Sequence, residues 1–406
     1  MDDRRTSTEG ARHAVRMLGL AQAAAFAVTG ITVTIGPLSL HELSGHEGFG
    51  GGLLAVFILS GGAGAFLAGR LMRRISRRAC LVAGHLTYGA AGVAAAAAGA
   101  AHSPRAILVA AIPLGLGHGA ALLGRSVAVD LHPSGERGRA VGRILAVGAV
   151  GALSGPALVA GLRRLAADTG LDAHMLPWLA VPVLGALGAL AVSRLRLEPS
   201  RPSPAPRGPA PSGGRGRPRG RMAAPTLVVA GAQAAMLALM SVIPVHIHHQ
   251  GGGDALMALI LGAHLASMYG LAPLLGAGID RWGHRDGLVA GAGLCVAGAM
   301  LGAVTHVPVV AAAGLVALGA GWSASYLGVT AAAGLEADPR DRASALGLAD
   351  LVASGTAAAA GILTGLLVDV VGIVALAWFV ASAMGVVLLI ACRPRLARVA
   401  PVGALD

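Results

Sequence analysis

Four side chains that can bind a soft metal ion lie at helical spacing in the second half of the chain. Met236 and Met240 form an M-x-x-x-M pair, and His264 and Met268 form an H-x-x-x-M pair. Residues four apart lie on one face of a helix, so each pair presents its two donors together. Thioethers are soft, neutral donors that favour Cu(I), and the set contains no carboxylate for a hard cation. The pattern indicates a copper site, with plain core packing of the methionines as the alternative.

The expected depth of these side chains suits a transport site. If their helices reach the outer boundary near residues 246 and 254, Met236 and His264 both lie roughly 15 Å inside it. Transporters place substrates near this level, and ionisable side chains there are usually functional. Further donors lie on the outer side, namely His246, His248, His249 and Met257. We expect these to collect the ion, with polar residues at a helix end as the alternative.

The composition indicates a membrane protein. The 406 residues are 55% hydrophobic and 12% charged, with a mean hydropathy of +0.72. A spanning helix needs about 20 apolar residues. Apolar runs predict an all-α membrane protein with twelve transmembrane helices near residues 14–38, 50–71, 79–101, 105–129, 139–162, 174–195, 224–246, 252–279, 286–305, 307–333, 342–368 and 371–392.

The basic residues are distributed as a topology signal. All 31 are arginine, and 26 of them gather in alternate loops, whereas the opposite loops hold only Arg105, Arg163 and Arg164. By the positive-inside rule, both termini and the central linker are cytoplasmic, and the protein is a multi-pass protein of the inner (cytoplasmic) membrane, with the lipid bilayer around it. The net charge of +12 is thereby explained without nucleic acid.

Two six-helix halves repeat along the chain. The sequence G-R-L-M-R-R-I-S-R-R around Arg73 matches G-A-G-I-D-R-W-G-H-R around Asp280 at an offset of 207 residues, and Arg137 matches Arg342 at an offset of 205. Six helices per repeat indicate parallel repeats about an axis along the membrane normal. A stretch rich in Pro, Gly, Ser and Arg between them predicts a disordered cytoplasmic linker. The predicted domains are residues 1–195, the linker 196–223 and residues 224–406.

The repeated loop resembles the signature of the major facilitator superfamily, G-x-L-a-D-r-x-G-r-r, and the resemblance covers essentially the whole chain. It implies a major facilitator fold of two pseudo-symmetric six-helix bundles that rock about a central site. In that family the acid and arginines of the signature form a cytoplasmic charge relay that latches one conformation. The second copy retains the matching residues Asp280, Arg281, Gly283 and Arg285. In the first copy Arg73 replaces the acid and Ser76 the glycine, so the resemblance does not predict a latch there.

The methionine and histidine pairs resemble those of the CcoA-like copper importers, and the surrounding P-V-H-I-H-H and H-L-A-S-M-Y-G-L-A-P segments are similar to that branch. The copper-binding set of that family matches Met236, Met240, His264 and Met268. The resemblance implies import of copper as the transported substrate, without a cofactor, for cuproenzymes such as cytochrome oxidase and with copper chaperones as partners. Family members are associated with redox-active cysteine pairs, whereas Cys80, Cys295 and Cys392 form no such motif.

Other polar residues in the expected spans have less specific roles. Asp350 is expected to carry a coupling proton or to form a structural hydrogen bond with a neighbouring helix. Arg125 and Asp130, five residues apart, are expected to snorkel and pair at the membrane interface. Packing or hydrogen bonding is expected for His85, Tyr88 and His118, with a position facing the cavity as the alternative.

Two other functions stay open. A carrier of an organic solute, such as a vitamin like riboflavin or a drug exchanged for protons, would share the fold. The aromatic content of 3% disfavours it, because flat rings usually need stacking partners. A membrane sensor or assembly factor that binds copper and docks a partner through the linker is disfavoured because no appended soluble domain is expected. No catalytic triad, phosphate loop or paired-carboxylate motif appears, so an enzyme is not expected.

Overall fold

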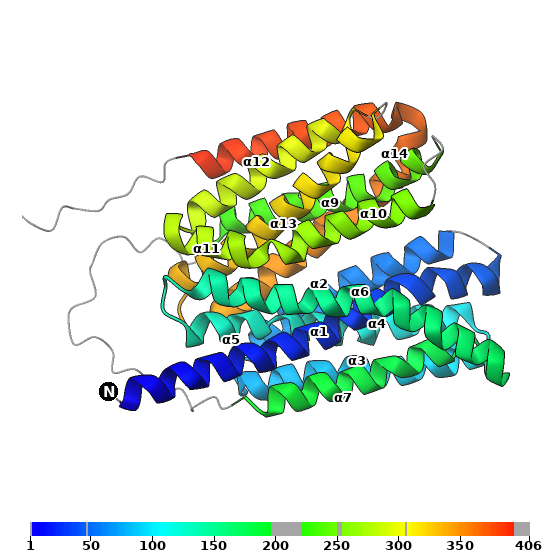
Figure 1. Ribbon diagram of the computed structural model, residues 1–406, viewed down its shortest axis with the longest axis horizontal. Coiled ribbons are helices and arrows are strands. Elements are labelled where there is room, and N and C mark those ends of the chain that lie inside the picture. Colours follow the sequence, from blue (N-terminus) through cyan, green and yellow to red (C-terminus); the bar gives the residue numbers. More distant parts are fainter. Residues whose placement is uncertain (1, 46–47, 196–220, 250–253, 305–306, 394–406) are drawn as a thin grey trace, which may run out of the picture.

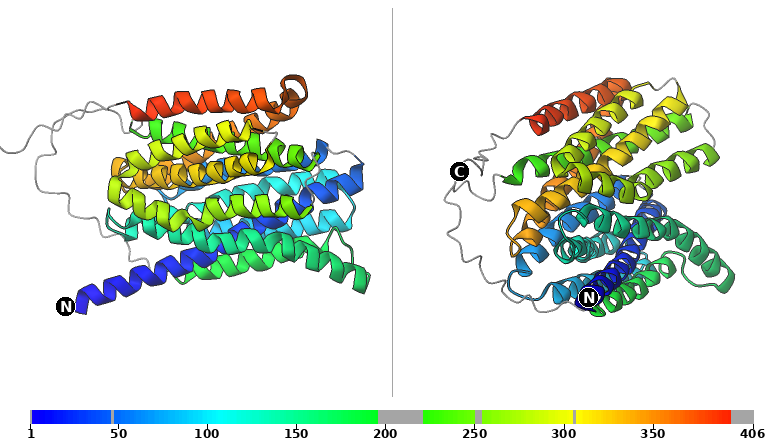
Figure 2. Two further views of the ribbon diagram at one scale, coloured as in Figure 1. Left: turned by 45° about the horizontal axis from the view of Figure 1, so that its top comes forward. Right: turned by 60° about the vertical axis from the view of Figure 1, so that its left-hand side comes forward.

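A computed structural model of the chain describes residues 2–45, 48–195, 221–249, 254–304 and 307–393 as a bundle of long helices (Figure 1). The first half of the chain forms one side of the bundle and the second half the other (Figure 2). The helices of the first half are α1 (Asp2–Ser44), α2 (Gly48–Leu71), α3 (Arg77–Ala100), α4 (Pro104–Leu122), α5 (Gly124–Leu131), α6 (Arg137–Thr169), the 3₁₀ turn η1 (Leu176–Leu179) and α7 (Ala180–Ser193). Those of the second half are α9 (Ala223–His249), α10 (Asp254–Leu265), the π-helix η2 (Ala266–Gly270), α11 (Ala272–Trp282), α12 (His284–Gly302), α13 (Pro308–Glu336) and α14 (Arg342–Cys392).

Among the described residues, ten helical segments are long and apolar enough to cross a membrane. Two features relate this number to the expected twelve helices. The last two expected helices form the single 51-residue element α14, in which the chain turns back at Gly372 with φ 78° and ψ 161°, a conformation that glycine adopts readily. The helix α12 begins with a polar turn, His284-Arg-Asp, and packs against α13, α14 and α9. The twelve-helix arrangement is therefore confirmed.

The bundle has two ends of different character. We call one the arginine-rich end; it carries the loops 72–76, 132–136 and 337–341, and lies on the left in Figure 1. The other, the far end, carries the loops 101–103 and 170–175. Residues 196–220, where we expected a disordered linker, lie outside the described residues.

Three clusters of buried apolar side chains hold the bundle together. One lies within the first half and one within the second. The third, which we call the shared core, combines side chains of both halves, such as Leu18 and Ile144 from the first half and Ala272 and Leu346 from the second. Many of its members belong to helix segments next to the arginine-rich loops. The two halves are thus packed together toward that end.

Glycines let the backbones of the two halves touch there. A Cβ atom at Gly69 of α2 would lie 2.4 Å from the backbone oxygen of Ala343 in α14. A Cβ at Gly276 of α11 would lie 2.1 Å from the backbone oxygen of Gly138 in α6. Gly69 and Gly276 occupy equivalent positions in the two copies of the repeated loop sequence. The α2–α14 and α6–α11 crossings are therefore pseudo-symmetric, and each depends on small residues at the contact.

Candidate functional site

His264 lies fully buried in the last turn of α10, directly before the π-helix η2. Its Nδ1 lies 2.7 Å from the backbone oxygen of Leu315 in α13, so this oxygen accepts a hydrogen bond from Nδ1–H. That tautomer leaves Nε2 unprotonated, and Nε2 is buried without a hydrogen-bond partner among the described residues. Gly319 permits the approach of the two helices, since a Cβ there would lie 2.8 Å from the His264 backbone oxygen. Metal-binding histidines are commonly held by a backbone carbonyl in this way.

The methionines divide between two clusters. Met236 of α9 and Met268 of η2 are 7% and 5% exposed, and both belong to the shared core. Met268 lies four residues after His264 within a π-helical turn, a rare feature that is frequent at functional sites. Met240 is half-buried and packs against the core of the second half instead. The structure thus brings Met236 and Met268 into one buried cluster and places Met240 in another.

The outer donors are described only in part. His246 is half-buried near the end of α9, while the side chains of His248, His249 and Met257 lie outside the described residues. Within the part of the chain that the structure describes, no group of three or more His, Cys, Asp or Glu side chains is placed to hold a metal ion.

Sequence reasoning missed a row of aromatic side chains at the centre. Phe26 of α1 lies 5.0 Å from Tyr269 of η2, which lies 6.0 Å from Trp322 of α13, and Trp322 stacks on Tyr326 at 5.0 Å, all measured between ring centroids. The Trp322 indole donates a hydrogen bond to Gln233 of α9. The chain has only five Phe, four Trp and three Tyr, yet four of these rings meet where the halves join. The low aromatic content, which argued against a flat organic solute, is an average over the chain. Where the halves join, aromatic rings are concentrated.

Arg125 and Asp350 form an ion pair between the halves. Nη2 of Arg125 in α5 lies 2.6 Å from Oδ1 of Asp350 in α14, and the two side chains are 2% and 16% exposed. The guanidinium carbon of Arg125 also lies 4.1 Å from the centroid of the Tyr326 ring. Pairing of Arg125 with Asp130 was a wrong expectation, because residues five apart point to different sides of a helix. A structural bond from Asp350 to a neighbouring helix is confirmed, and its role in proton coupling stays a prediction.

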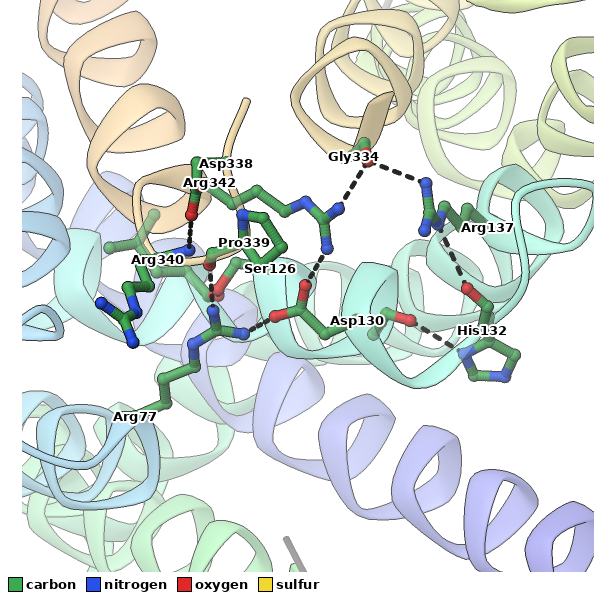
Figure 3. Close-up of polar contacts among 12 residues, drawn as sticks. Arg77, Ser126, Asp130, His132, Arg137, Gly334, Asp338, Pro339, Arg340 and Arg342 are labelled. Carbon is green, nitrogen blue, oxygen red and sulfur yellow. Dashed lines mark hydrogen bonds and ion pairs between the residues drawn. The ribbon is translucent and has the colours of Figure 1, made fainter. Parts of the chain in front are cut away.

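Asp130, at the end of α5, is held by arginines from both halves (Figure 3). It pairs with Arg77 at the start of α3 and with Arg342 at the start of α14. Arg342 also donates a 2.7 Å hydrogen bond to the backbone oxygen of Gly334, and Arg137 of the first half donates to the same oxygen at 2.9 Å. Gly334 lies in the last turn of α13, where backbone oxygens have no helical donor. This cluster therefore ties α3, α5 and α6 to α13 and α14.

Asp280 connects the second half to the first. Its two carboxylate oxygens accept hydrogen bonds from the backbone N–H groups of Gly138 and Arg139, at 2.7 Å and 2.9 Å, in the first turn of α6. These N–H groups have no partner within the helix, and a carboxylate there also offsets the positive end of the helix dipole. Asp280 thus acts on a helix terminus of the other half.

The remaining residues of that signature act within their own half. Gly283 has φ 102°, which favours glycine, and it separates α11 from α12. Arg285 donates hydrogen bonds to the backbone oxygens of Cys392 and Arg393 at the end of α14. Arg281 is exposed. The expected charge relay is therefore better described as one carboxylate that caps α6 and one arginine that caps α14.

The first copy of the signature makes a related contact with its charge reversed. Nε of Arg73 lies 3.2 Å from Oδ1 of Asp341, and both side chains are about half exposed, at 56% and 48%. Asp341 is the residue that precedes the first turn of α14. The halves are thus joined at this position too, although the acid of the signature is replaced.

Three polar residues of the first half form the expected packing contacts. Nδ1 of His85 lies 2.6 Å from the Tyr88 hydroxyl, and both side chains are buried. Nε2 of His118 lies 3.3 Å from Oγ1 of Thr29. Hydrogen bonding is therefore confirmed for all three residues, while Nδ1 of His118 is buried without a partner among the described residues.

Comparison with known proteins supports the fold and leaves the substrate open. A family model described as Major Facilitator Superfamily matches residues 18–268 and 226–403. The uncharacterized MFS-type transporter YddS of Bacillus subtilis is 28% identical, over 84% of this chain and 81% of its own length. The riboflavin transporter RfnT of Brucella anthropi is 27% identical, over 98% of this chain and 99% of its own length.

Solved structures share the same architecture. The human organic anion transporter MFSD10 superposes with a TM-score of 0.76 at 15% identity, covering 94% of this chain and 99% of that chain. The transporter FucP in its outward conformation superposes with a TM-score of 0.69 at 17% identity, covering 93% and 97%. At such identities the likeness establishes the fold alone.

Proposed function

The chain belongs to the Major Facilitator Superfamily, and we propose that it is a secondary transporter that carries copper into the cytoplasm by alternating access. The arginine-rich end is then cytoplasmic, in accord with the positive-inside rule. Because the halves pack together at that end, the structure corresponds in this proposal to a state closed toward the cytoplasm. The His246, His248, His249 and Met257 side chains would receive the ion first, and cytoplasmic copper chaperones would take it over.

The single observation that carries this proposal is the imidazole of His264. A buried nitrogen without a hydrogen-bond partner costs about 1–3 kcal/mol, so it calls for a physical reason. The Leu315 oxygen fixes Nδ1–H and thereby keeps the Nε2 lone pair free. Binding of a cation at Nε2 gives this nitrogen its missing partner.

The methionines of the predicted ligand set favour a soft ion. Met236 and Met268 supply neutral thioethers from the shared core, with Met240 one turn farther along α9. Thioether ligands select Cu(I) over harder divalent ions, and uncharged ligands allow the ion to be released again from a site of low dielectric constant. In this proposal Asp350 couples transport to protons, since protonation would weaken its ion pair with Arg125.

The test is uptake of Cu(I) into liposomes that contain the purified protein. Copper is supplied with a reductant and measured inside the vesicles by mass spectrometry. We expect His264→Ala and Met236→Ala to lower the initial rate by about tenfold or more, the effect of losing about 1.4 kcal/mol or more of interaction.

A matched methionine serves as the control. Met300 lies on α12 and is 44% exposed, so Met300→Ala should transport copper at the wild-type rate. Equal uptake by His264→Ala, Met300→Ala and the wild type would contradict the proposed site. No copper uptake by the wild-type protein would contradict the proposed substrate.

A flat organic solute is the second candidate, and the central aromatic row favours it. Stacking on Trp322 and Tyr326 would hold such a ring, and the similarity to a riboflavin transporter suggests riboflavin as the first solute to test. Riboflavin uptake that is lost in Trp322→Ala and retained in His264→Ala would support this candidate over copper. The reverse pattern, with copper uptake lost in His264→Ala, would exclude it.

A further inference from the structure

All four proposed copper ligands lie on the second half of the chain. In alternating access the cargo must stabilise the state in which both halves enclose it. A ligand shifts a conformational equilibrium only if it binds one state more tightly than the other. An ion bound by one half alone moves with that half and favours no state. The first half therefore needs a ligand of its own at the interface.

His118 of α4 is the candidate for this ligand. It contacts Thr29 of α1 and Phe57 of α2, and it lies on the side of Arg125 nearer the far end. Arg125 follows seven residues later in α5, beyond the break between the two helices, and reaches across to Asp350 and Tyr326 of the second half.

His118 also has the required chemistry. Its side chain is 7% exposed, and its ring lies 5.2 Å from that of Phe57 in α2, centroid to centroid. The Thr29 hydroxyl lies 3.4 Å from the Ala25 backbone oxygen, to which it donates, so it accepts from Nε2–H of His118. Nδ1 is then unprotonated, and it is buried without a partner among the described residues. Like His264, His118 therefore has one ring nitrogen in a hydrogen bond and the other without a hydrogen-bond partner among the described residues.

The repeat places the neighbours of His118 at the positions of the proposed ligands. The offset of 207 residues that relates Arg73 to Asp280 also relates Thr29 to Met236 and Phe57 to His264. The two residues that contact the His118 ring are therefore the first-half counterparts of two proposed ligands. In the second half the imidazole is that of His264, on α10, which is the counterpart of α2. In the first half the imidazole is that of His118, on α4.

We infer that His118 is the first-half ligand for the transported cation, bound through Nδ1 when the far ends of the halves close. This inference rests on the proposed function. It assigns the site to both halves: the four second-half ligands receive the ion, and His118 joins them in the closed state. No electron or proton is exchanged in this step, since a neutral nitrogen replaces water or an outer ligand on the same ion.

The experiment compares two substitutions of nearly equal volume, His118→Met and His118→Leu. Both remove the imidazole and its bond to Thr29, but only methionine supplies a soft donor. Three quantities are measured in full-length protein: Cu(I) affinity in detergent, Cu(I) uptake into liposomes, and the distance between spin labels at Leu171 and Val307. These two residues are 48% and 38% exposed at the far ends of the first and second halves.

In the wild type and in His118→Met, we expect Cu(I) to shorten the label distance and to be transported. In His118→Leu we expect affinity within about threefold of the wild type, no Cu(I)-dependent shortening, and uptake lowered by about tenfold or more. Shortening and uptake in His118→Leu equal to those in His118→Met would overturn the inference and leave the proposed function intact. Absence of Cu(I) binding by the wild type would remove the proposed function, and the inference with it.

Discussion

At the arginine-rich end, the second half holds α6 through Asp280, whereas the first half holds α14 through Arg73. The backbone geometry is the same, because Gly276 and Gly69 let the two helix crossings form in equivalent positions. The chemistry differs. Asp280 binds two N–H groups of α6 directly, while Arg73 needs the Asp341 side chain as an intermediate.

This difference indicates which contact is the stronger one. A carboxylate on unpaired helix N–H groups gains both hydrogen bonds and a favourable interaction with the helix dipole. An ion pair that is half exposed is typically worth about 0–1 kcal/mol. The first half compensates through Asp130, whose bond to Arg342 supplies a better buried connection to α14. We therefore expect the α2–α14 side to depend on Asp130 and the α6–α11 side on Asp280.

Two measurements test this comparison in each variant. The first is the thermal unfolding temperature of the purified protein. The second is the distance between spin labels at Ile75 and Leu335, exposed residues of the two halves at the arginine-rich end.

The largest effect is expected for Asp130→Asn. The change leaves Arg77 and Arg342 without their shared carboxylate, and breaking a buried ion pair costs about 3–5 kcal/mol. Because the Asp130 side chain is 21% exposed, we expect the lower limit, about 3 kcal/mol, together with a longer label distance. An unchanged distance and unfolding temperature would show that Asp130 does not hold the halves together.

Gly276→Ala and Gly69→Ala are expected to have the next largest effects, and similar ones. Each added methyl group meets a backbone oxygen of the other half, and such overpacking costs about 1–3 kcal/mol. Both variants should lengthen the label distance. Gly293→Ala is the control, since a Cβ at Gly293 has no atom within 4 Å outside its own helix. A marked difference between the two interface variants would contradict the equivalence of the two crossings.

Asp280→Asn should weaken the α6–α11 side by about 1 kcal/mol, since the amide oxygen can keep one of the two hydrogen bonds but loses the charge. The label distance should increase less than in Asp130→Asn. If Asp280→Asn proved the more damaging of the two, the second-half contact would be the main connection between the halves.

The smallest effect is expected for Arg73→Ala, at about 0.5 kcal/mol and declining with added salt. Arg74→Ala, the exposed neighbour, is the matched control. Arg73→Asp alone should lower the unfolding temperature by placing two carboxylates together. Adding Asp341→Arg should recover part of the loss, and not all of it, because an arginine at the N-terminus of α14 interacts unfavourably with the helix dipole. Failure of the double variant to recover would indicate that this ion pair contributes nothing to the contact.

The sequence predicted the spans well because each depends on local properties. Apolar length and the position of glycine, proline and arginine are read directly along the chain, so the helices that contain Met236, His264 and Asp350 were located correctly. The errors are at junctions. The π-helix before Leu271 and the break between α4 and α5 arise from backbone conformations that hydropathy does not report, and the turn at Gly372 lies two residues beyond the expected junction at 369–370.

The site was predictable in residue type and not in arrangement. The M-x-x-x-M and H-x-x-x-M spacing selected four candidate ligands, but the placement of Met240 apart from Met236 and Met268 depends on how α9 packs. The aromatic row was invisible because its members, among them Phe26 and Trp322, come from distant segments.

The sequence alone determined that this chain crosses the membrane many times, that it consists of two related halves, and that its arginines mark one end. These properties follow from apolar length, repetition and charge, which each segment carries by itself. Only the tertiary structure decided that Arg125 meets Asp350, that Asp280 caps α6 and that both His264 and His118 keep one nitrogen free. Such pairings join residues far apart in the chain, and they depend on glycine contacts that fix how closely the helices approach.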